Sequence, residues 1–70
     1  MFTIYEASKK WLDDKEKEFP YLTAASATIR PEDNPYDKDC CSAVLEKGFR
    51  TYAFKTEAAR DAFIKWRDAL

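Results

Sequence analysis

Along the first third of the chain, apolar and polar residues recur with the period of an amphipathic helix. Thr3 and Glu6 have the spacing of a capping box, so we expect a helix over residues 4–18. Pro20 disfavours helical geometry at the preceding residue and ends this segment. A short first strand at residues 2–4 is the alternative, because so short a pattern does not exclude it. The side expected to face a core comprises Ile4, Ser8, Trp11, Leu12, Lys15 and Phe19.

Residues 21–29 are rich in β-branched and small side chains, a composition that favours a strand. Its odd-numbered positions form the expected inward face, namely Tyr21, Thr23, Ala25, Ala27 and Ile29. Residues 30–39 then combine two prolines with four acidic side chains and little apolar content. This composition is typical of an exposed loop.

Residues 40–46 and 49–55 flank the dipeptide Lys47-Gly48, which predicts a β-hairpin with a two-residue turn. In that register one face carries Cys41, Ala43 and Leu45 with Arg50, Tyr52 and Phe54, and the reverse face carries Ser42, Val44, Phe49 and Thr51. A three-residue turn would instead place Phe49 beside Leu45. Because a slip of one residue exchanges the two faces, the sequence leaves open which aromatic residues are exposed.

Residues 57–69 show a second helical pattern. Thr56 is a suitable N-cap, and Glu57 complements the positive end of the helix dipole. The apolar stripe expected to bury against a sheet comprises Ala59, Ala62, Phe63, Trp66 and Leu70. Ile64 lies outside this stripe, among charged residues, so we expect it to be exposed.

Taken together, these elements predict the order α-β-β-β-α. The fold class that accommodates them is α+β, a two-layer sandwich in which a three-stranded antiparallel sheet carries both helices on one face. The opposite face of the sheet would then be open. An uncovered face with several apolar side chains is the kind of surface associated with binding sites.

Composition limits the size, the compartment and the partner. Five Phe, four Tyr and two Trp among 70 residues supply enough apolar surface for residues 1–70 to fold as one small domain. The formal net charge is -1, and no concentrated basic stripe points to nucleic acid. With no leader and no apolar run of membrane-spanning length, we expect a cytoplasmic protein without a membrane partner. The adjacent Cys40 and Cys41 make a poor disulfide and fit a reducing compartment.

The chain contains few of the side chains that enzymes most often use in catalysis. The chain has no His, the residue that most often serves as general acid or base near neutral pH. With no His to activate Cys40 or Cys41, we interpret both as structural residues. The acidic loop lacks the ligand spacing of a calcium site, and two vicinal Cys do not make a closed zinc site. We therefore expect no enzyme activity, no metal and no cofactor.

Residues 47–54 resemble in part the octapeptide of RNA-recognition-motif domains, which runs basic, Gly, aromatic, small, aromatic, apolar, any, aromatic. Thr51 stands where that motif has its second stacking aromatic. The resemblance implies an alternative function, the binding of single-stranded nucleic acid. In it Phe49 would stack on a base, and Lys47, Arg50 and Lys55 would contact phosphates. We disfavour this alternative because a single aromatic makes a poor platform.

The favoured hypothesis is a protein-binding module, a small inhibitor or adaptor that occupies a surface of a larger protein. It resembles phage-encoded inhibitors of host or defence proteins in size and layout only. The residues expected to contact the partner are Ile64, Tyr36, Phe49, Arg50, Asp33 and Asp37. A self-complementary sheet face would also allow a homodimer.

Overall fold

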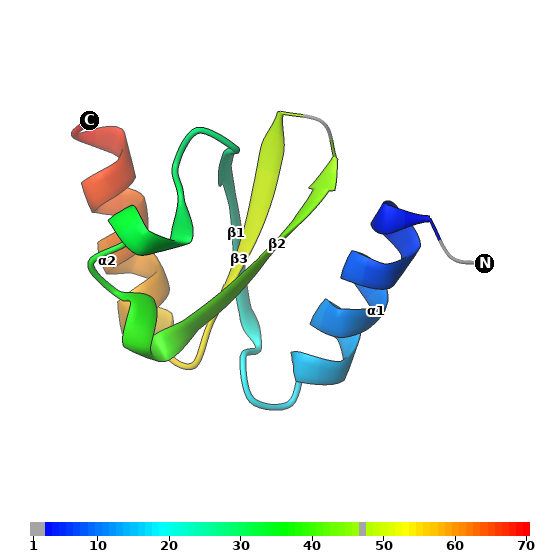
Figure 1. Ribbon diagram of the computed structural model, residues 1–70. Coiled ribbons are helices and arrows are strands. Elements are labelled where there is room, and N and C mark those ends of the chain that lie inside the picture. Colours follow the sequence, from blue (N-terminus) through cyan, green and yellow to red (C-terminus); the bar gives the residue numbers. More distant parts are fainter. Residues whose placement is uncertain (1–2, 47) are drawn as a thin grey trace.

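The computed structural model describes residues 3–46 and 48–70 (Figure 1). Its elements are α1 (Ile4–Lys15), β1 (Tyr21–Ser26), β2 (Cys40–Glu46), β3 (Phe49–Phe54) and α2 (Glu57–Asp68), with two short 3-10 turns, η1 (Pro31–Asp33) and η2 (Asp37–Asp39), between β1 and β2. The predicted α-β-β-β-α order is confirmed. The three strands form one antiparallel sheet in the order β1-β3-β2, so β3 is central and the other two strands are edges.

Both helices begin where the sequence predicts. The hydroxyl of Thr3 accepts a hydrogen bond from the backbone of Glu6 at 3.1 Å, and the Glu6 carboxylate accepts one from the backbone of Thr3 at 2.9 Å. This reciprocal capping box starts α1 at Ile4, which belongs to the helix and not to a first strand. Thr56 caps α2 in the same way, by accepting from the backbone of Ala59. Each cap satisfies backbone donors that the first helical turn leaves without a partner.

The hydrophobic core lies between α2 and one face of the sheet. Phe63 of α2 is fully buried, and its ring centroid lies 4.6 Å from that of Tyr52 and 5.3 Å from that of Phe54. The Tyr52 hydroxyl donates to the carbonyl oxygen of Ile29 at 2.7 Å, so this buried polar group is satisfied. Ala25 of β1 is buried in the same core. This agrees with the prediction that the odd-numbered positions of the first strand face inward.

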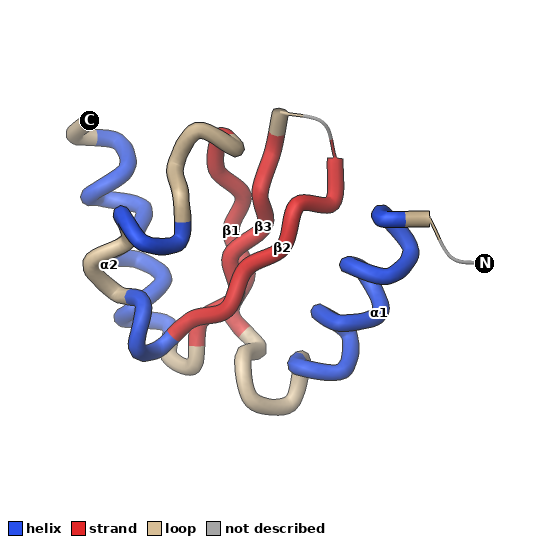
Figure 2. The backbone as a smooth tube through the Cα atoms, viewed as in Figure 1, coloured by secondary structure: helices blue, strands red, loops and turns tan. Residues whose placement is uncertain are grey.

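The placement of both helices on one face is wrong, because the sheet lies between them (Figures 1 and 2). α2 covers the face that carries Tyr52 and Phe54, whereas α1 packs on β2 from the other side. The central strand explains this arrangement. Ala53, which points away from the α2 core, is also buried, so β3 needs cover on both faces.

A β-bulge in β2 changes the predicted faces of the hairpin. Glu46 pairs with Phe49 as a two-residue turn requires, although Lys47 lies outside the described residues. Between Ala43 and Glu46 the register shifts, so that Ser42, and not Ala43, lies opposite Tyr52. One extra residue on β2 is enough to exchange its faces. The prediction that Cys41 shares a face with Tyr52 is therefore wrong.

Candidate functional site

The described residues leave part of the sheet face beneath α1 uncovered. α1 packs mainly on the edge strand β2, and on this face Leu22 of β1 and Phe49 of β3 are exposed, whereas Ala53 of β3 is buried. The resulting depression is a cavity of about 280 Å³. Its walls include Leu12, Asp13 and Glu16 of α1, Leu22 of β1, Leu45 of β2 and Thr51 of β3.

A second hollow of about 350 Å³ continues this depression toward the hairpin turn. It is lined by Tyr5, Ala24, Leu45, Phe49 and Thr51, so the two hollows share two lining residues. We call the combined depression the α1 groove. Its aromatic and aliphatic walls are unusually exposed: 57% of Leu22, 57% of Phe49 and 47% of Tyr5 is accessible to solvent.

Strand alternation places these apolar side chains in the groove. Leu22 pairs with Ala53, and Phe49 pairs with Ser26 at the other end of the ladder. Both therefore point away from the α2 core, which takes the alternate positions of each strand. No second helix of the described chain covers them, because α2 lies on the other face.

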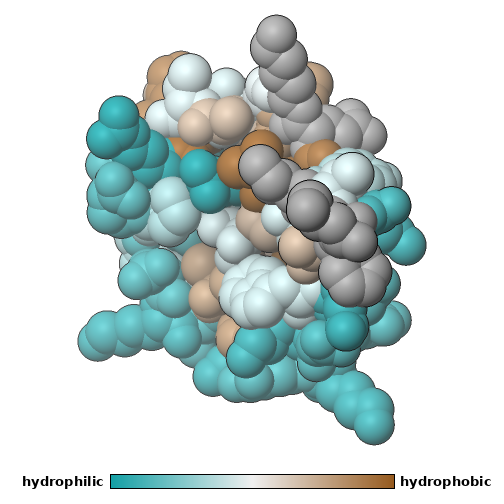
Figure 3. Space-filling view, turned by 45° about the vertical axis from the view of Figure 1, so that its right-hand side comes forward, coloured by the Kyte–Doolittle hydropathy of each residue, from teal (hydrophilic) through white to brown (hydrophobic). Residues whose placement is uncertain are grey.

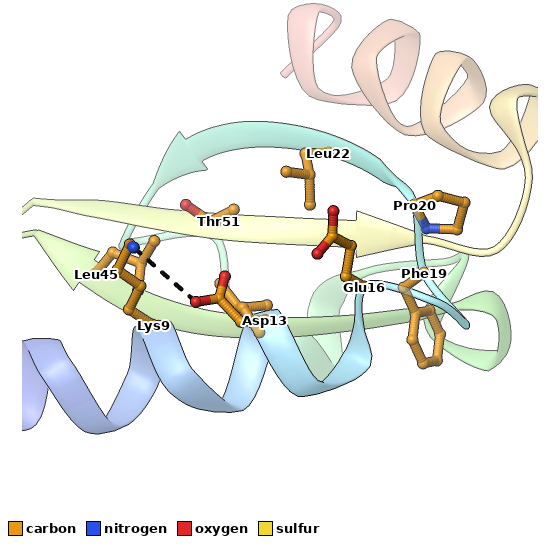
Figure 4. A pocket seen from close by; sticks show the side chains of 9 residues that line it. Lys9, Asp13, Glu16, Phe19, Pro20, Leu22, Leu45 and Thr51 are labelled. Carbon is orange, nitrogen blue, oxygen red and sulfur yellow. Dashed lines mark ion pairs between the residues drawn. The ribbon is translucent and has the colours of Figure 1, made fainter.

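Charged side chains border the α1 side of the groove (Figure 4). Lys9 forms an ion pair with Asp13 at 3.9 Å. Glu16 points into the opening toward Leu22, and its carboxylate has no ion pair within the described part of the chain. One cation and two anions leave this rim with an acidic excess. The groove thus combines an apolar floor with a negative border.

A smaller apolar surface lies on the opposite side of α1. Trp11 lines a shallow hollow with Ala7, Ser8 and Ala43, and it stays exposed, contrary to its expected position on the buried side of the helix. Val44 in the bulge is exposed as well. On the side turned forward in Figure 3, apolar side chains gather in the upper and central part, and hydrophilic side chains dominate the lower part.

The six residues expected to contact a partner do not form one surface. Phe49 lies in the α1 groove, but Arg50 is its neighbour on the strand and points to the opposite face. The Nε atom of Arg50 is buried there without a hydrogen-bond partner. Ile64 is half-buried in a hollow on α2, beside Asp61 and Asp68.

The acidic loop is built differently from an open binding loop. Tyr36 is half-buried and packs against the α2 core, and its backbone N–H donates to Asn34 Oδ1 at 2.8 Å. The two carboxylates that flank it are exposed, Asp33 in η1 and Asp37 in η2. Tyr36 therefore contributes to the fold, and its expected contact with a partner stays a prediction.

The residues of the nucleic-acid alternative are also scattered. Lys55 follows the far end of β3 from Phe49, and its ammonium pairs with Glu18 at 3.5 Å. Arg50 faces the other side of the sheet, and Lys47 lies outside the described residues. Phe49 and Thr51 do share the α1 face, so β3 offers one ring where the motif has two, and neither Arg50 nor Lys55 lies beside that ring on this face.

The two cysteines have little nucleophilic character. Burial, followed by the nearby charges of Asp37 and Cys41, raises the pKa of the Cys40 thiol to about 11. Burial also raises the pKa of Cys41. Asn34 Nδ2 donates to Cys40 Sγ at 2.9 Å, which ties the loop to the start of β2. Among the described residues, no three His, Cys, Asp or Glu side chains come together as a metal site would require.

Sequence reasoning missed the residues that form most of the groove. Tyr5 was assigned to neither side of the first helix, although it lines the groove. Leu22 carried a usable signal: it is the one large aliphatic residue at an even position of residues 21–29, opposite the inward face. A large apolar residue on the outer face of a strand indicates either a second covering layer or a binding surface.

No family model, curated protein or solved structure significantly matches this chain, so its geometry alone carries the functional argument. Neither helix in residues 3–46 and 48–70 combines the length and the apolar character needed to cross a bilayer.

Proposed function

We propose that this protein is a non-enzymatic binding module that docks on a larger protein through the α1 groove. The observation that carries the proposal is the exposure of Leu22 and Phe49, each 57% accessible, on the same face of a strand ladder. Apolar side chains on a rigid floor, with charges at the border, resemble the core and rim of protein interfaces.

Occupancy of a partner surface is the function that such a module performs. The described side chains offer no activated nucleophile and no metal cluster, and the cysteines are held protonated by their raised pKa. A domain that binds without reacting acts by blocking a surface or by bridging two proteins. We therefore propose an inhibitor or adaptor role inside the cell, where its free thiols stay reduced.

Site-specific photo-cross-linking in the source cells tests the proposal. A benzophenone amino acid replaces Leu22 or Phe49 in the groove, and in a matched variant it replaces Ile64 on the opposite side of the molecule. We expect positions 22 and 49 to capture the same protein and position 64 to capture none. Equal capture from position 64, or no capture from either groove position, would overturn the proposal.

A substitution provides the complementary measurement. Leu22→Asp should reduce recovery of the cross-linked partner at least tenfold, because it places a charge on the apolar floor. Since Leu22 is exposed, the melting temperature should change by no more than about 3 °C. Unchanged partner recovery from a folded Leu22→Asp protein would also contradict docking through the groove.

A further inference from the structure

We infer that the partner inserts a single amphipathic α-helix into the α1 groove, beside α1, with a basic residue along the edge of its apolar stripe. The inference rests on the proposed binding function and specifies the chemistry of the occupant. Four observations lead to it: the width of the uncovered sheet, its length, the state of the β1 edge and the charge of the rim.

The exposed part of the sheet has about the width of one helix. α1 lies beside β2 (Figure 1), and on the same face of the neighbouring strands Leu22 of β1 and Phe49 of β3 are exposed, whereas Ala53 of β3 is buried. Adjacent strands lie about 4.8 Å apart, so two strands span about 10 Å. Packed helices lie 8–10 Å apart, so the free strip has about the width of a second helix laid parallel to α1.

The length of the groove fits two to three helical turns. Leu22 pairs with Ala53, four positions along β3 from Phe49. Four strand positions correspond to about 13 Å, which a helix covers with about nine residues. Leu22 lies near one end of the groove, and Phe49 and Tyr5 lie at the other. They would contact apolar side chains of the partner helix that are spaced one and two helical turns apart.

An extended strand fits this site less well. A partner strand would have to pair with the open edge of β1 rather than lie on the sheet face. At that edge the guanidinium of Arg67 already donates to the carbonyl oxygen of Ala24. Arg67 therefore blocks strand addition in the middle of β1, as charged side chains do at protected sheet edges.

A second copy of this chain is a poor occupant. Both helices of another copy carry charged side chains on their exposed faces, Glu6 and Asp14 on α1 and Glu57 and Asp61 on α2. Insertion of either helix between two sheets would bury such charges against apolar strands, which is strongly unfavourable without matching partners. The partner helix therefore comes from a different protein.

The rim selects the charge of that helix. Asp13 is paired with Lys9, whereas Glu16 has no ion pair in the described chain and points into the opening (Figure 4). A Lys or Arg at the edge of the apolar stripe would pair with Glu16. An acidic residue there would meet a like charge at the border of a partly desolvated groove.

Titration of the 70-residue protein with model peptides tests the inference. Three 14-residue probes are used: Leu/Lys with Leu at helical spacing, Leu/Glu with the same spacing, and Leu/Lys with strict alternation, which forms a strand. Binding is measured by amide chemical-shift changes. We expect the helical Leu/Lys peptide to bind at least fivefold more tightly than the other two and to shift the amides of Leu22, Ala24 and Thr51.

A charge reversal with a matched control sharpens the test. Glu16→Lys should reverse the preference between the two helical peptides, whereas Asp14→Lys makes the same change in charge on the outer face of α1 and should preserve it. Leu22→Ser should weaken binding of the helical Leu/Lys peptide at least tenfold. The inference is overturned if the alternating peptide binds as tightly as the helical Leu/Lys peptide. It is also overturned if both charge variants show the same peptide preference, or if binding of no peptide reaches saturation.

These outcomes are distinct from a failure of the proposed function. If positions 22 and 49 capture a protein but the helical peptide is not preferred, the groove is still a binding site and the proposal of a helical partner is rejected. Selective helical-peptide binding without a cellular cross-link would support the chemistry of the groove and reject its use in the source cells.

Discussion

At the scale of single residues, Cys40 and Cys41 show how neighbours on a strand acquire different environments. Cys40 pairs with Phe54, packs against the α2 core and accepts a hydrogen bond from Asn34. Cys41 pairs with Ala53 and lies on the α1 face. Because adjacent strand residues point to opposite faces, both thiols are free, as the sequence predicts.

The raised pKa of Cys40 predicts a loss of stability in alkali. Burial raises the pKa of this thiol to about 11 in the folded protein, whereas its ordinary value in an unfolded chain is 9.0. Between these values the unfolded chain releases the proton first, so rising pH favours unfolding. Urea titrations should show the free energy of unfolding falling more steeply from pH 9 to 11 in the natural protein than in Cys40→Ala. Parallel pH profiles of the two proteins would contradict the assignment, as would rapid alkylation of Cys40 at pH 8.

At the scale of elements, the two helices are held very differently. α2 contributes fully buried Phe63 to the core, whereas none of the described side chains of α1 is buried. The position of α1 above an edge strand explains this difference, because β2 offers only part of the sheet width. α1 therefore belongs to the less stable part of the fold, in the sense of local opening.

Hydrogen exchange of the backbone amides should show that α1 is less stable than α2. We expect α1 to exchange through an opening of lower free energy than the global unfolding that exposes α2 and β3. Thr3→Ala removes a cap worth about 1 kcal/mol and should accelerate exchange in α1 alone. The matched change Thr56→Ala removes the cap of α2 and should lower global stability instead. If Thr3→Ala lowers the protection of every element equally, α1 is an integral part of the cooperative core.

At the scale of the whole molecule, charge is dispersed rather than gathered. The net charge is -1, and Lys55, the basic residue at the far end of β3, is paired with Glu18. Nucleic-acid binding draws most of its affinity from several cations that contact phosphates together. The groove offers an acidic border instead, which repels a phosphate backbone.

We therefore expect no saturable binding of mixed-sequence single-stranded DNA or RNA in fluorescence titrations, even at low salt. Submicromolar binding that weakens steeply with added salt would show that a basic surface forms after all. Loss of that binding in Phe49→Ala, with Tyr5→Ala unaffected, would then identify base stacking and favour the alternative function.

The sequence alone was sufficient to predict the identity of the elements, their order and the caps that start both helices. These features depend on periodicity and on side chains within four residues of one another. The same local information yields the inward face of β1, because a strand of six residues carries its own alternation.

Tertiary structure alone decided where the faces lie and what stays uncovered. The bulge between Ala43 and Glu46 depends on how β2 meets β3, and a shift of one residue there exchanges two faces. The side of the sheet that α1 occupies depends on the need of β3 for cover on both faces, which only the central position of β3 in the sheet creates. The α1 groove follows from both of these long-range facts. Its exposed residues, Leu22 above all, are apolar positions that no other element within residues 3–46 and 48–70 covers.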